Sequence, residues 1–176
     1  FLFYVESRLT APDAVGPLLL LFFMSAALAA PLWTFLAERF GLKRVLRAAM
    51  GLAIFSLFWV LFLNSGDVIA FGVICVLSGA AVGADMTLIP AVFAQRIAHI
   101  GASTTDGFGL WSFVSKFSLA VAAVILLPSL EFAGFRSGQE NSAVALGVLT
   151  WTYALVPCAL KLLAIAVLQR TDLRES

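Results

Sequence analysis

Long apolar runs separated by short polar segments fill almost the whole chain. The runs are long enough to cross a bilayer, because about 20 residues at 1.5 Å each span a hydrocarbon core. The pattern predicts an all-α membrane protein with five complete transmembrane helices, and residues 1–5 as the end of a sixth. The expected complete spans are 16–37, 45–63, 68–98, 107–131 and 142–169.

Composition supports this class. Apolar residues make up 62% of the chain and charged residues 12%, and the mean hydropathy is +1.04. These values lie far from those of soluble domains. A net charge of +1 indicates no nucleic-acid partner. Cys75 and Cys158 lie in apolar runs, which predicts small buried side chains and neither a disulfide nor a metal site. The chain lacks an initiator Met and a secretory signal, so we expect a fragment of a longer protein.

Basic residues favour one side of the expected membrane protein. Seven of the eleven Lys and Arg residues belong to the segment 38–47, the end of the third complete span, or the C-terminal tail. Arg8 and Arg136 lie on the other side. The positive-inside rule therefore predicts that the segment 38–47, the turn around His99 and the C-terminus are cytoplasmic.

Small residues recur at intervals of three and four along the expected span 68–98. Such a pattern indicates a seam at which another helix approaches closely. The members of the predicted seam are Gly72, Cys75, Gly79, Gly83, Met86 and Pro90.

Lys116 lies near the middle of the expected span 107–131. Placing a lysine at that depth costs about 2.5–3.5 kcal/mol on insertion scales, so its side chain is expected to face a protein interior or a wet cavity. Lys116 shares a small and polar helical stripe with Gly109, Ser112, Ala120 and Ala123. The alternative is a lysine that extends to the membrane interface. Trp111, five residues before Lys116, is assigned to the same cavity, although lipid anchoring or packing also explains a tryptophan there.

Asp85 is the second charge expected inside the membrane. Asp85 is assigned to the substrate and cation cavity, where it could pair with Lys116 or share a polar face with Ser78. A structural hydrogen bond to backbone near Pro90 also remains open. Lys161 lies near the cytoplasmic end of its long span, which favours extension to the interface or a structural contact.

The segment 38–47, between the first two complete spans, is expected to be a charged loop. It carries a recognisable order of residues: Glu38, Arg39, Gly41, Lys43 and Arg44. This order resembles the cytoplasmic signature of the major facilitator superfamily, in which an acidic residue and Arg precede Gly and a basic cluster. Thr34 stands where that signature has its first Gly. Gly41 is suited to a tight turn between two helices.

A second resemblance covers nearly the whole chain. Its residues are Gly83-Ala-Asp85 with Pro90, then Phe108-Gly109 followed by Phe113 and Lys116, and a last helix with Tyr153, Pro157-Cys158 and Lys161. The pattern is similar to that of the glycoside–pentoside–hexuronide:cation symporters, the melibiose carrier-like family. Gln95-Arg96 replaces the Asp that this family often has there.

The resemblance implies twelve helices in two six-helix bundles, with this chain as the C-terminal bundle. It implies cation-coupled symport of a sugar or glycoside across the inner membrane by alternating access. The missing N-terminal half would then supply most of the site for the coupling cation, Na⁺ or H⁺, with Lys116 facing it. No cofactor is expected. The partners are a small solute, the bilayer and the N-terminal half.

Other functions remain open at this stage. A transporter of the same fold for another solute, such as a lysolipid, is a close alternative. A non-transporting membrane subunit is another. A membrane enzyme is disfavoured, since the chain has a single histidine, cysteines without metal-like spacing and no recognisable nucleophile motif.

Overall fold

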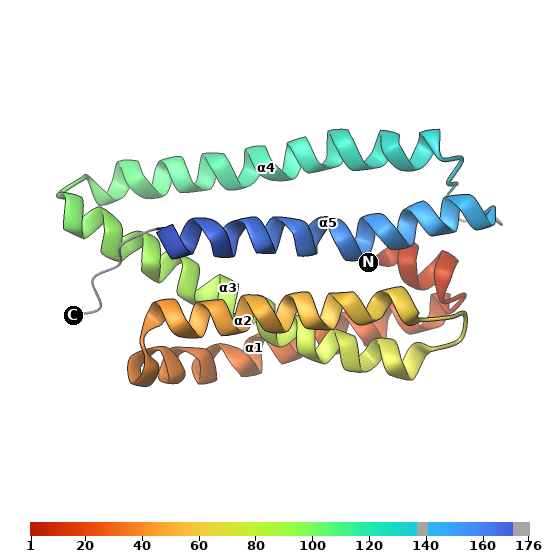
Figure 1. Ribbon diagram of the computed structural model, residues 1–176, viewed down its shortest axis with the longest axis horizontal. Helices are drawn as coiled ribbons and strands as arrows, with labels where there is room; N and C mark the ends of the chain where they lie inside the picture. The colour runs from red at the N-terminus through yellow and green to blue at the C-terminus, as the bar shows by residue number, and fades with distance from the viewer. Residues whose placement is uncertain (137–140, 171–176) are drawn as a thin grey trace.

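The computed structural model describes residues 1–136 and 141–170. Five long helices account for most of this part of the chain: α1 (Val15–Phe40), α2 (Leu42–Phe58), α3 (Val68–Ile100), α4 (Thr104–Phe132) and α5 (Ala143–Arg170) (Figure 1). Shorter segments are the π-helical η1 (Tyr4–Arg8) and the 3-10 helices η2 (Pro12–Ala14) and η3 (Trp59–Phe62). Four of these helices, and α2 continued by η3, have the length and composition to cross a membrane, which confirms the predicted all-α membrane fold.

The long helices run back and forth along one axis of the molecule (Figure 1). α1 packs most extensively on α3, while α2 contacts both α3 and α5. α4 packs sparingly on α3 and α5, and it runs along one side of the molecule in Figure 1. Residues 137–140 of the expected loop after α4, and the expected C-terminal tail with Arg174, lie outside the described residues.

α1 and α3 touch through their backbones. Gly79 and Gly83, one turn apart on α3, lie against the backbone of Phe22 and Ala26, also one turn apart on α1. A Cβ on either glycine would collide with the facing carbonyl oxygen. Farther along α3 the contact is looser, because a Cβ at Gly72 would meet only leucine side chains at 3.7 Å. The predicted small-residue seam is thus confirmed at its glycines.

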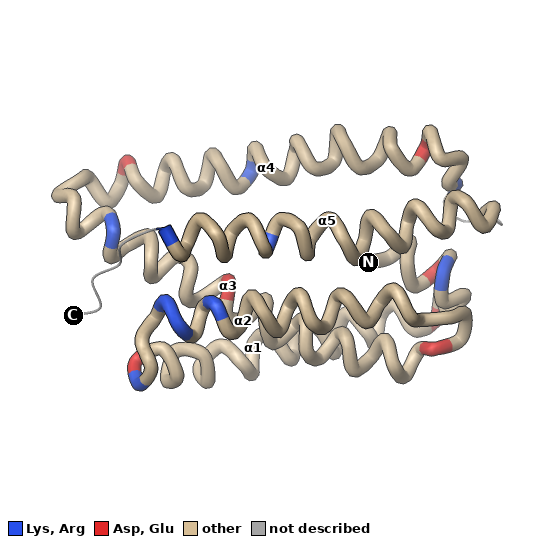
Figure 2. The backbone as a smooth tube through the Cα atoms, in the orientation of Figure 1, with Lys and Arg blue, Asp and Glu red and all other residues tan. Residues whose placement is uncertain are grey.

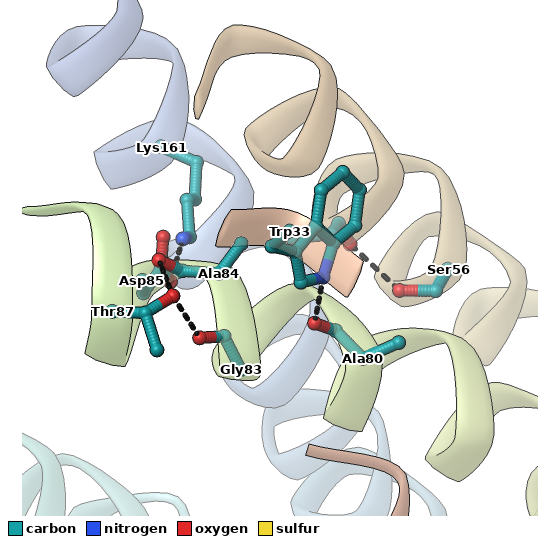
Figure 3. A network of polar contacts seen from close by, with 9 residues as sticks. Trp33, Ser56, Ala80, Gly83, Ala84, Asp85, Thr87 and Lys161 are labelled. Atoms are coloured by element: carbon teal, nitrogen blue, oxygen red, sulfur yellow. Dashed lines mark hydrogen bonds and ion pairs between the residues drawn. The ribbon is translucent and has the colours of Figure 1, made fainter. Parts of the chain in front are cut away.

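Met86 does not belong to this seam. Its side chain is 74% exposed, so the α1–α3 contact does not include it. Near the same crossing, the indole Nε1 of Trp33 on α1 donates a hydrogen bond of 2.7 Å to the carbonyl oxygen of Ala80 on α3 (Figure 3). A hydrogen bond between helices adds a polar link to a contact otherwise made by close packing.

The segment 38–47, expected as a charged loop, is a helical hairpin. α1 continues to Phe40 and α2 begins at Leu42, so Gly41 alone separates them. Gly41 has φ 89°, a conformation that glycine adopts without the steric cost of a Cβ. The helices extend past the apolar runs because Glu, Arg and Lys are good helix formers. The prediction of a loop was therefore wrong, and that of a tight turn at Gly41 is confirmed.

The turn between α3 and α4 is nearly as short. Gly101 ends α3 with φ 66°, and its successor Ala102 donates from its backbone N–H to the carbonyl of Ile97. Ser103 then caps α4, since its hydroxyl oxygen accepts a hydrogen bond of 3.3 Å from the backbone N–H of Asp106. The two helices therefore meet at one corner of the molecule, where the chain reverses its direction (Figure 1).

Replacing Gly79 or Gly83 by Ala is expected to push α1 away from α3, since the new methyl group meets backbone that cannot rotate aside. Overpacking of this kind costs about 1–3 kcal/mol. We expect a lower free energy of unfolding for the full-length protein in detergent, measured by chemical denaturation. Gly51→Ala is the matched control, because nothing lies within 4 Å of a Cβ there. Equal stability of all three variants would contradict the backbone contact.

Candidate functional site

An ion pair joins two helices inside the membrane-spanning part of the molecule. The Nζ atom of Lys161 on α5 contacts Oδ2 of Asp85 on α3 (Figure 3). The two side chains are 21% and 20% exposed, so other parts of the bundle cover most of the pair. Charges in such a place are stable when they compensate each other. The possible Asp85–Lys116 pair is therefore not formed, and a structural contact accounts for Lys161.

Only one oxygen of the Asp85 carboxylate is compensated. Oδ1 is buried and has no hydrogen-bond partner among the described residues. The nearby hydroxyl groups do not serve it: Thr87 donates to the carbonyl of Gly83, and Ser78 donates to the carbonyl of Ile74. The expected polar face of Ser78 and Asp85 is consequently not a shared hydrogen-bond network. A buried oxygen without a donor calls for a further partner, such as water or another group.

Lys116 lies on the exposed surface of α4 and makes no hydrogen bond or ion pair with the described part of the chain. The other members of its stripe, Gly109, Ser112, Ala120 and Ala123, are exposed too. Bulky residues elsewhere on α4 are equally uncovered, for example Phe117 at 58% and Val124 at 72% exposure. Residues 1–136 and 141–170 thus bury neither the Lys116 stripe nor these bulky residues of α4.

Trp111 has a definite packing role. Its ring lies 4.9 Å from the ring of Phe93 on α3, centroid to centroid, and Phe108 packs edge-on against the same Phe93 at 5.6 Å. This aromatic cluster joins the start of α4 to the end of α3. Trp111 therefore fixes the first turns of α4 against α3. The Lys116 and Ser112 side chains, on the same helix, do not contact Asp85.

The motif residues at the α1–α2 hairpin take different positions. Glu38, Arg39 and Arg44 are exposed, and the guanidinium of Arg39 lies 5.5 Å from the centre of the Phe40 ring. Lys43 is half-buried and donates a hydrogen bond of 3.3 Å to the carbonyl of Gln169, in the last turn of α5. A basic group is stabilising at a helix C-terminus. Lys43 therefore connects the hairpin to α5.

Basic side chains gather at this end of the molecule. Figure 2 shows most of the Lys and Arg positions where α1 meets α2 and where α3 and α5 end, with few at the opposite end. No group of three or more His, Cys, Asp or Glu residues in the described ranges could hold a metal ion.

These features define a multi-pass membrane protein with compensated charge inside its helix bundle and, at its edge, an uncovered helix that carries Lys116. The chain belongs to the MFS/sugar transport protein family, whose model matches residues 1–175. This match confirms the resemblance to the major facilitator superfamily, and the description of the family names transport and no catalysed reaction.

A human relative, the sodium-dependent lysophosphatidylcholine symporter 1, is 30% identical over 127 residues. The matched region covers 68% of this chain and 23% of that protein, so the chain spans a minor part of its relative's length. No solved structure matches the chain.

The partner of Lys161 is the feature that sequence reasoning did not assign. The available signal was a lysine and an aspartate as lone charges in two different apolar spans. The sequence suggested only Lys116 as a partner of Asp85, whereas the rotation of each helix about its axis decides which lysine meets it. Helical periodicity defines faces within one helix but not which faces meet.

Removing one member of the Asp85–Lys161 pair is expected to destabilise the protein more than removing both. Asp85→Leu or Lys161→Met leaves one uncompensated charge, which lowers the free energy of unfolding by about 3 kcal/mol. The double variant leaves no uncompensated charge. The free energy of unfolding of the full-length protein in mild detergent measures this. A double variant at least as unstable as the worse single variant would contradict the pairing.

Proposed function

We propose that this chain is the C-terminal helix bundle of a secondary active transporter, which couples uptake of a solute to entry of a cation by alternating access. The observation that carries the proposal is Lys116 on the uncovered small and polar stripe of α4. A cation on a membrane-spanning helix requires an anionic or aqueous environment. A second bundle across a central cavity supplies one.

Lys116 has two tasks in this mechanism. Its ammonium group neutralises carboxylates of the N-terminal bundle while the coupling cation is absent. It also offers three hydrogen-bond donors to the solute. Ser112, one turn away on the same stripe, adds a hydroxyl group to the cavity wall. Rocking of one bundle against the other then exposes the cavity to each side of the membrane in turn.

Two solute classes are candidates. The family description supports a sugar or glycoside. The similarity to a lysophosphatidylcholine symporter supports a lysolipid, and the sodium dependence in that relative's name supports sodium over H⁺ as the coupling cation. A non-transporting subunit would fit the fold, but it gives the exposed Lys116 no role. The cavity between the bundles, rather than the Asp85–Lys161 pair, is the proposed solute site.

We place the protein in the cell inner membrane, with the α1–α2 hairpin, the turn after α3 and the C-terminus on the cytoplasmic side. The gathering of basic residues at that end of the bundle supports this orientation, because Lys and Arg are retained preferentially in the cytoplasm (Figure 2).

Lys116→Ala is expected to abolish gradient-driven uptake by the full-length transporter while membrane insertion stays normal. The exposed side chain makes no hydrogen bond or ion pair with the described residues, so its loss is not expected to unfold the bundle. Uptake of radiolabelled solute into proteoliposomes, with and without a sodium gradient, measures the effect. Val114→Ala is the control, since Val114 is 50% exposed and lies two residues from Lys116, on the opposite face of α4. Unchanged uptake in Lys116→Ala would contradict the cavity role.

Competition assays on the same proteoliposomes separate the two solute classes. Inhibition by excess sugars or glycosides supports the first, and inhibition by lysolipids supports the second. Binding of neither class would return the non-transporting subunit as the better account.

The proposed orientation predicts that a cysteine at the exposed position 44 (Arg44→Cys) is protected from membrane-impermeant maleimide in intact cells. A cysteine at the exposed position 136 (Arg136→Cys) reacts under the same conditions, because it lies at the other end of the bundle. The native Cys75 and Cys158 are buried and give a low background. Labelling with the two reactivities reversed would invert the topology.

A further inference from the structure

A groove opens between η1, η3 and the beginning of α5, at the end of the molecule away from the Gly41 hairpin. Its volume is about 400 Å³. Leu61, Leu146 and Trp151 form apolar walls, and the Arg8 side chain lies at the groove. No acidic residue lines it in the part of the chain that the structure describes. The groove is thus apolar with one positive charge.

The guanidinium of Arg8 has unused donors. It gives one hydrogen bond of 3.2 Å to the carbonyl oxygen of Leu63, at the end of η3. No carboxylate in the described ranges forms an ion pair with it. A guanidinium carries five N–H donors in a planar fork that matches a phosphate or carboxylate. The Leu63 contact holds the side chain in place and leaves most of this fork available.

The apolar part of the groove has open space and an interfacial residue. Trp151 is 62% exposed on α5, and tryptophan is enriched where a membrane meets water. Gly147, one turn earlier, has no side chain, and a Cβ built there would meet nothing within 4 Å. The floor of the groove at Gly147 is therefore unfilled by protein.

We propose that this groove binds a membrane phospholipid of the adjacent leaflet. The phosphate group accepts hydrogen bonds from Arg8, and the glycerol and upper acyl chain lie over Gly147 against Leu146 and Trp151. The Arg8 guanidinium lies beside the apolar part of the groove. This arrangement complements a phospholipid, in which the phosphate group is attached close to the hydrocarbon chains. Free inorganic phosphate would use the charge and leave the channel empty. The inference does not rest on the proposed transport function, since the lipid is a resident ligand and not the solute.

Native mass spectrometry of the purified full-length protein, delipidated and titrated with dioleoylphosphatidylglycerol, tests the proposal. Arg8→Gln and Gly147→Leu are expected to weaken binding of one lipid by about tenfold, the size expected for losing a charge-assisted hydrogen bond. The second variant acts by filling the groove and leaves the charge intact. Two matched controls keep normal binding: Arg136→Gln removes another basic residue from the same end, and Gly51→Leu adds a side chain in open space elsewhere.

Two further titrations complete the test. Dioleoylglycerol, which lacks the phosphate, is expected to bind weakly and with no difference between the wild type and Arg8→Gln. Inorganic phosphate is expected not to displace the phospholipid. Equal phospholipid binding by wild type, Arg8→Gln and Gly147→Leu would overturn the proposal. If dioleoylglycerol bound as tightly as the phospholipid, apolar contact alone would account for binding and the proposal would be overturned. Displacement of the phospholipid by inorganic phosphate would also overturn it, because it indicates a free-anion site.

Discussion

The direct approach of α3 to α1 is the constraint on which the rest of the bundle depends. In a membrane, lipid tails are as apolar as leucine, so burial of apolar surface gives helices little reason to associate, and close packing must replace it. Gly79 and Gly83 allow the two backbones to touch at Phe22 and Ala26. Once this crossing is fixed, α3 has a defined rotation about its axis. That rotation directs Asp85 toward α5 and presents the carbonyl of Ala80 to Trp33.

The charges within the membrane are handled in two ways. Asp85 and Lys161 compensate each other inside the bundle, so the chain meets the cost of that pair with its own residues. Lys116 is treated differently: α4 carries it on a surface that the described residues leave uncovered. The first arrangement stabilises a bundle, while the second belongs to a surface that another body must complete. This contrast is why the solute cavity is proposed at α4 and not at the ion pair.

The sequence was most informative where local rules suffice. The five membrane-crossing helices follow from apolar runs of sufficient length, and the seam at Gly72, Gly79 and Gly83 follows from small residues spaced by helical turns. It was least informative where geometry between helices decides. Nothing local distinguishes Lys161 from Lys116 as the partner of Asp85, because both are lone lysines in apolar helices. The hairpin at Gly41 was misjudged as a loop for another reason, since charged residues end an apolar run without ending a helix.

The single residue between α1 and α2 has a mechanical consequence. With Gly41 alone as the joint, the two helix ends have no slack, and a tilt of α1 must carry the beginning of α2 with it. Lys43 lies two residues after the joint and holds the carbonyl of Gln169, so the same displacement reaches the last turn of α5. One glycine and one lysine thereby couple the ends of three helices. A displacement of this end of α1 is transmitted to α2 and α5, because no flexible connection lies between α1 and α2 to absorb it.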